Sequence, residues 1–116
     1  MTVDSANAVL YTLGVPPNNR EIDVFAFKGG LQVLEFHFLP RTGTQNAAQN
    51  FTEAWLTYQT AMDAYHSQSG SLVLTTCDTI ASRIEGTFTF AGLQSGGTGT
   101  VSITEGNLLV TRLSIQ

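Results

Sequence analysis

The stretch "AGLQSGGTGTVS", residues 91–102, places two glycines and a hydroxyl at the spacing of a phosphate-binding loop. Gly92, Gly97 and Thr98 occupy those positions. Such a loop also needs a lysine beside the second glycine and a following helix whose N–H groups point at the anion. Here no lysine is near, and "TVSITEG" alternates like a strand. We therefore predict a hairpin loop and no nucleotide site.

The first histidine, His37, follows a carboxylate on one predicted strand. Glu35 and His37 share a strand face, about 7 Å apart by the rise of an extended chain. A hydrolase would need a nucleophile beside such a base, but no strained turn marks one of the serines. We interpret the pair as a solvated strand face and predict no catalytic residues. A small hydrolase or metal-dependent enzyme using His37 or His66 is one alternative.

The second histidine, His66, lies three residues after Asp63. On a helical turn these two side chains would be neighbours, a ligand spacing known from helix bundles. Asp78 or Glu85 could complete the set, but nothing in the sequence specifies which. We interpret the segment as a polar loop and predict neither a metal site nor a cofactor.

Aromatic residues gather in "NFTEAWLTYQTAMDAYHS". Phe51, Trp55, Tyr58, Met62 and Tyr65 recur at spacings of four and three, which is the stripe of an amphipathic helix. Trp, Thr and Tyr nevertheless favour strands over helices. The residues alone leave both structures open.

This aromatic region is the most plausible binding site. Its periodicity conflicts with the rest of the chain, and such local conflicts often mark functional positions. Aromatic side chains on a β-scaffold can stack on sugar rings or anchor a protein partner, although they can equally close the core. The candidate ligand- or partner-binding residues are Trp55, Tyr58, Tyr65 and His66.

Charged residues make up only 12% of the 116 residues, and the formal net charge is −4. A chain with no basic patch is a poor partner for nucleic acid. The single cysteine, Cys77, excludes an internal disulfide and a multi-cysteine zinc site. No apolar run approaches the roughly 20 residues of a membrane span.

Elsewhere the apolar residues alternate with polar ones, as in half-buried strands. Two stretches show this most clearly: Leu34, Phe36 and Phe38 share one face, and Ile84, Phe88 and Phe90 share another. Gly86 interrupts the second row, which indicates a bulge or a close backbone approach. "EIDVFAFK" and "SLVLTTC" are partly apolar on both faces, as in strands covered on two sides.

Turn signals such as "KGG" and "TEGN" separate these strands. We predict one all-β domain over residues 1–116, mostly antiparallel. It would be a meander-like β-sandwich or a partly closed barrel of about 7–9 strands, folded over itself to bury its apolar face.

The second half, "SGSLVLTTCD…SRIEGTFTFAG…GTVSITEGNLLV", resembles an uncharacterised family of small Bacteroidota cell-envelope proteins, many of them lipoproteins. The resemblance covers about 50 residues and is carried by strand and turn positions. The matching residues are Tyr65, Gly70, Leu74, Asp78, Ile84, Gly86, Thr87, Phe88, Phe90, Ile103, Glu105 and Gly106.

This resemblance implies an all-β fold and export to the periplasm or cell surface, with room for a lipid anchor upstream of the sequence. It also implies that the aromatic segment divides into a short helix near residues 51–57 and a strand around 64–67. The family has no catalytic residues to carry over.

Together these observations favour an exported, non-enzymatic module that binds a polysaccharide or an envelope protein. The alternative from another class is a self-associating structural subunit, because few lysines guard the strand edges.

Overall fold

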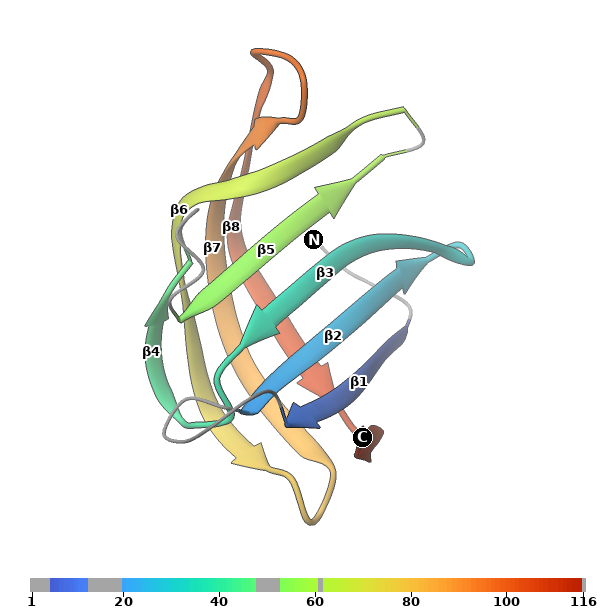
Figure 1. Cartoon of the computed structure of the whole chain (residues 1–116), viewed down its shortest axis with the longest axis vertical. Coiled ribbons are helices and arrows are strands. Elements are labelled where there is room, and N and C mark those ends of the chain that lie inside the picture. The colour runs from blue at the N-terminus through green and yellow to red at the C-terminus, as the bar shows by residue number, and fades with distance from the viewer. Residues whose placement is uncertain (1–4, 13–19, 48–52, 61, 116) are drawn as a thin grey trace.

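The computed structural model describes residues 5–12, 20–47, 53–60 and 62–115. In these ranges the chain is all strand and turn, and no helix is long and apolar enough to cross a membrane. One mostly antiparallel sheet contains all nine strands (Figure 1). The strands are β1 (Ser5–Thr12), β2 (Arg20–Lys28), β3 (Leu31–Phe38), β4 (Gly43–Asn46), β5 (Ala54–Gln59), β6 (Ala64–Asp78), β7 (Arg83–Gln94), β8 (Thr100–Val110) and β9 (Leu113–Ile115).

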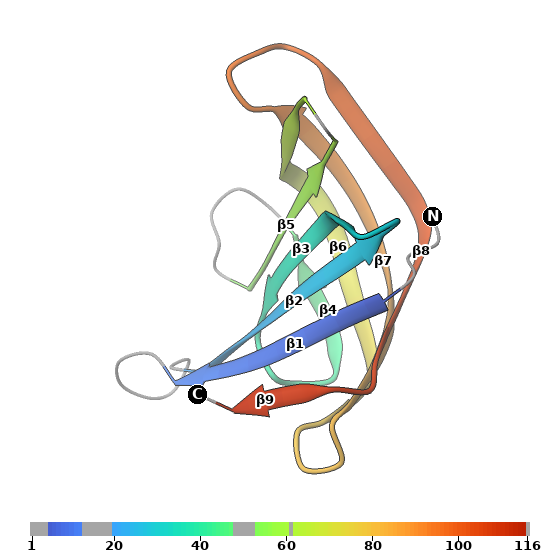
Figure 2. The ribbon, with the colours of Figure 1, turned by 90° about the vertical axis from the view of Figure 1, so that its right-hand side faces the viewer.

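The order of the strands across the sheet is β8-β7-β6-β5-β3-β2-β1-β9. The long strand β6 serves two neighbours on one side, because its first residues pair with β5 and Ser71–Leu74 pair with β4. The sheet curls so far that β9, which directly follows β8 in the chain, runs parallel to β1 at the other end (Figure 2). The all-β, mostly antiparallel prediction is confirmed, as one sheet folded over itself.

The inward side of this curled sheet holds the hydrophobic core. The apolar residues predicted to share faces on β3 and β7 are fully buried there. Phe36 of β3 and Phe88 of β7 meet edge to face across the interior, with ring centroids 4.9 Å apart. Aromatic pairs in this arrangement add to the stabilisation that burial of their apolar area gives.

The predicted helix near residues 51–57 is wrong where the structure describes it; residues 51 and 52 lie outside the described part. Residues 54–59 form β5, in which Ala54 and Leu56 are buried and Trp55 points to the other side. The expected stripe does not form, since Met62 is 91% exposed in a turn. Strand propensity and pairing with β3 outweigh the helical spacing. The strand predicted around residues 64–67 is confirmed as the start of β6.

The glycine-rich loop of residues 95–99 joins β7 to β8, as predicted for a hairpin. The side chain of Gln94 holds it, because its Oε1 accepts a hydrogen bond from the Gly99 N–H at 3.2 Å. The prediction that β2 is covered on both sides is wrong, because no described strand lies over its outward side (Figure 2). That side carries the carboxylates of Glu21 and Asp23.

Gly86 of β7 is required by close contact with β6, as the interrupted apolar row predicted. A Cβ at this position would overlap the carbonyl oxygen of Val73. The register between the two strands also shifts beside it, between Leu74 and Thr76. Both the close approach and the bulge are therefore present.

We expect Gly86→Ala to lower the free energy of unfolding by about 1–3 kcal/mol, because a backbone carbonyl cannot move aside as a side chain can. Gly97→Ala is the matched control, since its Cβ would meet only the flexible end of Gln94. It should change stability by less than about 0.5 kcal/mol. Urea unfolding of both variants tests this, and equal losses would contradict the explanation.

Candidate functional site

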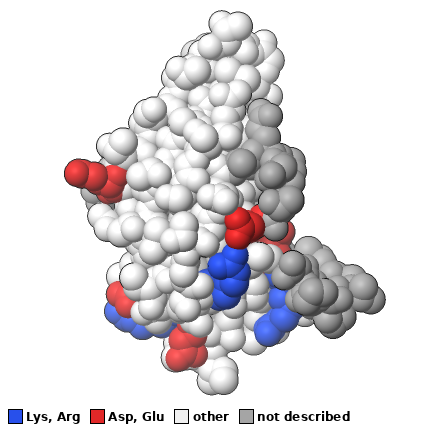
Figure 3. Space-filling view, turned by 90° about the vertical axis from the view of Figure 1, so that its left-hand side faces the viewer, with Lys and Arg blue, Asp and Glu red and all other residues white. Residues whose placement is uncertain are grey.

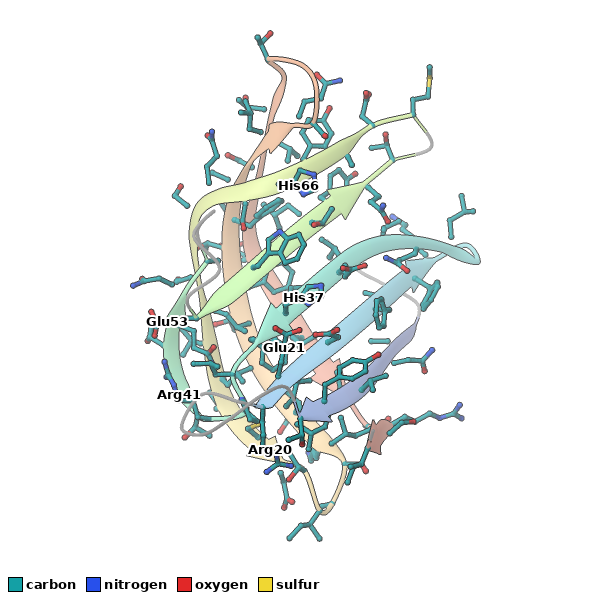
Figure 4. All side chains as sticks on the ribbon, viewed as in Figure 1. Arg20, Glu21, His37, Arg41, Glu53 and His66 are labelled. Atoms are coloured by element: carbon teal, nitrogen blue, oxygen red, sulfur yellow. The ribbon has the colours of Figure 1, made fainter. Side chains whose placement is uncertain are left out.

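Polar and aromatic side chains gather on the outward side of β2, β3, β5 and the start of β6, which we call the polar face. Strand pairing sets their order, because Asp23 lies opposite His37 and His37 lies opposite Trp55. A second row follows, in which Glu35 pairs with Thr57 and Thr57 with His66. Figure 4 shows His37, Glu21 and His66 on the same side of the sheet.

His37 is the centre of a compact cluster of charges. Its Nδ1 lies 3.0 Å from Oε2 of Glu21 and 2.9 Å from Oδ1 of Asp23. Its Nε2 lies 2.5 Å from Oε2 of Glu35. The four side chains are only 12–34% exposed, so their charges interact more strongly than on an open surface. Sequence spacing placed Glu35 and His37 about 7 Å apart, but the side chains bend together above the strand.

The environment of the cluster shifts the proton affinity of three groups. Burial raises the pKa of Asp23 to about 7, and the hydrogen bond to Glu21 acts in the same direction. Burial also raises the pKa of Glu21, but hydrogen bonds with Asp23 and His37 outweigh it and hold that pKa below its ordinary value. Burial lowers the pKa of His37, yet its bonds to Glu21 and Glu35 raise it overall. Below about pH 7, a protonated Asp23 can therefore donate a hydrogen bond to the Glu21 carboxylate.

The aromatic part of the polar face continues from His37 along β5. The imidazole of His37 stacks on the indole of Trp55, with centroids 4.5 Å apart and planes inclined by 19°. His66 lies beyond Trp55 as seen from His37, with its ring centroid 6.3 Å from that of the indole. Its Nδ1 is 3.3 Å from Oγ1 of Thr57. The stacking fixes the ring plane of His37 relative to its carboxylate neighbours.

A chain of side-chain hydrogen bonds extends the polar face toward the start of β3. Nε2 of Gln32 donates to Oε1 of Glu35 at 3.2 Å and lies 3.3 Å from Oε1 of Gln59. The two glutamines border a shallow hollow of about 210 Å³. Leu31, Val33 and Thr60 form the rest of its lining.

The four predicted binding residues are divided between two sides of the sheet. Trp55 and His66 belong to the polar face. Tyr58 and Tyr65 pair across β5 and β6 with ring centroids 6.0 Å apart, and both pack against the core. The structure thus brings these residues together as two pairs rather than as one surface.

The metal-ligand spacing considered for Asp63 and His66 does not form a site in the described part of the chain. The helix that it requires is replaced by a turn and strand β6, and Oδ1 of Asp63 accepts a hydrogen bond from Gln94 at 2.6 Å. Asp78 instead holds the turn after β6, and Glu85 pairs with an arginine.

Sequence reasoning missed Glu21 and Asp23, which complete the cluster. Their signal was the alternation "EIDV", which matches the alternation "EFHF" around His37 on the neighbouring strand. Among the described residues, Glu21, Asp23 and His37 form the one group of side chains close enough to hold a metal ion. The polar face therefore offers chemistry for a cation as well as for a hydroxylated ligand.

Comparison with protein-family models, curated proteins and solved structures gives no match to this chain.

The pH dependence of stability follows from Asp23 and His37. Both have folded-state pKa values above their ordinary ones, so each stabilises the protein at lower pH and loses this effect as pH rises through its folded pKa. Glu21 acts oppositely, but at acidic pH. Without metal, the wild type should lose stability as pH rises from the ordinary Asp23 pKa of 3.8 to its folded pKa of about 7, and further as pH rises through the folded pKa of His37.

Asp23→Asn should remove much of this loss, because an amide donates to Glu21 at every pH. At pH 8.5 we expect it to be more stable than the wild type by about 1–2 kcal/mol, in urea unfolding with EDTA. Glu105→Gln, an exposed charge change on β8, should keep the wild-type profile. A pH profile unaffected by Asp23→Asn would show that the cluster does not control it.

Proposed function

We propose that this protein is an exported, non-enzymatic module of the cell envelope that binds a polysaccharide through the polar face. One observation carries the proposal: hydrogen-bonding side chains run continuously from His37 through Glu35 and Gln32 to Gln59, on a side that no described strand covers. Half-buried charges cost stability in a fold that does not need them. Their presence on one sheet face supports a binding role.

The chemistry of this line of residues suits sugar hydroxyls. Carboxylates accept hydrogen bonds, and the amides of Gln32 and Gln59 both donate and accept. The hollow beside them is apolar on one side, through Leu31 and Val33, and its volume suits one sugar unit rather than a large ligand. Export is supported by the resemblance of the second half of the chain to envelope proteins.

The surrounding surface fits a neutral, hydroxylated partner. In Figure 3 the face on the β4 side carries few charges, most of them in its lower half, and its uppermost part shows none. In the whole chain, charged residues make up only 12%. Such a surface exerts little long-range attraction on charged partners.

A panel of soluble bacterial and plant polysaccharides, tested by affinity electrophoresis and then calorimetry, would examine the proposal. For a glycan that binds, the double variant Gln32→Ala/Gln59→Ala should weaken affinity at least about tenfold, since two or more hydrogen bonds are lost. The control Thr87→Ala/Thr89→Ala, on the outward side of β7, should bind as the wild type does. Absence of any retarding glycan, or equal affinities, would refute the proposal.

Self-association is the second candidate, favoured by the free edge of β8. Among the described strands, this strand of 11 residues pairs only with β7, and it carries one charge, Glu105. Leu109 on the same strand is 54% exposed. Long edges with few charges can add a strand from another chain.

If β8 mediates such pairing, sedimentation velocity should show dimers that increase with concentration. Ser102→Lys, which adds a charge to this edge, should restore the monomer without loss of fold. A wild-type monomer at high micromolar concentration would rule out self-association.

A further inference from the structure

Three potential ligand atoms converge beside the Nδ1 of His37. A carboxylate oxygen of Glu21 and one of Asp23 lie 3.0 and 2.9 Å from it. Ligand atoms about 2.1 Å from a first-row transition metal, at tetrahedral or octahedral angles, lie about 3.0–3.4 Å from one another. The two distances to Nδ1 thus match the spacing of neighbouring metal ligands, and the three ligand atoms all lie within 4.8 Å of one another.

An independent feature of the cluster points to a missing partner. Asp23 is buried, with only 8% of its surface exposed, yet its Oδ1 accepts no hydrogen bond. It is aimed at Nδ1 of His37, whose hydrogen bond goes to Glu21 instead. His37 is therefore a charged neighbour of this oxygen at 2.9 Å but does not donate a hydrogen bond to it, and a buried carboxylate oxygen without a donor is costly unless a cation coordinates it.

Glu35 holds the imidazole in the orientation that metal binding requires. Its Oε2 accepts the Nε2–H of His37, which leaves Nδ1 directed toward Glu21 and Asp23. Metal-binding histidines commonly have such a carboxylate on the other ring nitrogen, which fixes the tautomer and raises the basicity of the ligand. Stacking on Trp55 restrains the ring further. Glu35 is therefore a positioning residue rather than a ligand.

The charge balance of the cluster also favours a cation. Three carboxylates lie around one imidazole, and no described lysine or arginine forms an ion pair with them. The described arginine ion pairs lie elsewhere, between Arg41 and Glu53 and between Arg83 and Glu85. A divalent cation would compensate charge that imidazolium alone leaves unbalanced.

We propose that Nδ1 of His37 and the carboxylates of Glu21 and Asp23 bind one divalent transition-metal ion, with Glu35 orienting the histidine. The mixture of imidazole and carboxylate suits Zn²⁺ or Mn²⁺ better than Ca²⁺, which takes oxygen ligands only. Three protein ligands leave coordination positions for water or a bound molecule. This inference goes beyond the proposed polysaccharide binding and does not depend on it.

The test uses the full chain, stripped with EDTA and dialysed against Zn²⁺, Mn²⁺ or Ca²⁺, with bound metal measured by atomic emission. We expect one Zn²⁺ or Mn²⁺ per chain and no stoichiometric Ca²⁺. His37→Gln and Asp23→Asn should each weaken binding by about 100-fold or more, and Glu35→Gln by about 10- to 100-fold. His66→Gln is the matched control on the same face and should bind like the wild type.

Spectra of the Co²⁺ form separate positioning from ligation. In Glu35→Gln at saturating Co²⁺ the visible bands should resemble those of the wild type, whereas His37→Gln should change them. Circular dichroism checks that each variant is folded; if one is not, Glu21→Gln replaces it. Substoichiometric binding to the wild type, or an equal loss in His66→Gln, would overturn the proposal. Gln59→Ala leaves the hydrogen bond from Gln32 to Glu35 in place, so it should weaken glycan binding but still bind metal, which makes failure of glycan binding and failure of metal binding distinguishable.

Discussion

The arrangement of the polar face depends on one extra residue in the hairpin of β2 and β3. Next to the two-glycine turn the strands pair in simple register, but Ala26 lies opposite Leu34, which leaves Val33 as the additional residue of a β-bulge. Beyond the bulge Asp23 faces His37. Without the bulge, the pairing of the two strands would be shifted by one residue. Asp23 would then lie opposite Phe36, whose side chain belongs to the core. A shift of one residue exchanges the two faces of a strand, so the bulge decides both the core and the cluster.

Because of the bulge, β2 and β3 carry core residues on one side and charged residues on the other. Ile22 and Phe36 are fully buried on one side, while the other side holds a buried Asp23 and a half-buried Glu21 and His37. The packed side makes the position of every outward side chain definite, because core residues tolerate little displacement. A rigid sheet therefore keeps several like charges closer than they would remain in solution. Burial, together with this enforced proximity, shifts the pKa values of Asp23, Glu21 and His37.

Much of the fold could be predicted from the sequence, because period-two alternation is a local property of each strand. The aromatic segment was harder: Trp55 and Tyr58 are spaced for one helix face, yet in β5 they point to opposite sides of the sheet. Their partners His66 and Tyr65 divide in the same way. The cluster around His37 was not predictable from residue spacing, because it depends on the register between β2 and β3. That register is set by a bulge, and no residue type in the sequence indicates the bulge. Non-local pairing, rather than propensity, decided both outcomes.

The outward side of the rest of the sheet offers an internal comparison. Opposite β6, strand β7 presents Thr87 and Thr89, and Ser71 lies 3.4 Å from Thr89 through their hydroxyls. Where carboxylates do occur there, as at Glu85, an arginine pairs with them in an exposed position. The same fold can thus cover a sheet face with neutral hydroxyls at little electrostatic cost. The carboxylates beside His37 are neither replaced by hydroxyls nor paired with an arginine. The stability of the fold alone does not explain why they are there. The binding role that we propose for the polar face would account for their placement.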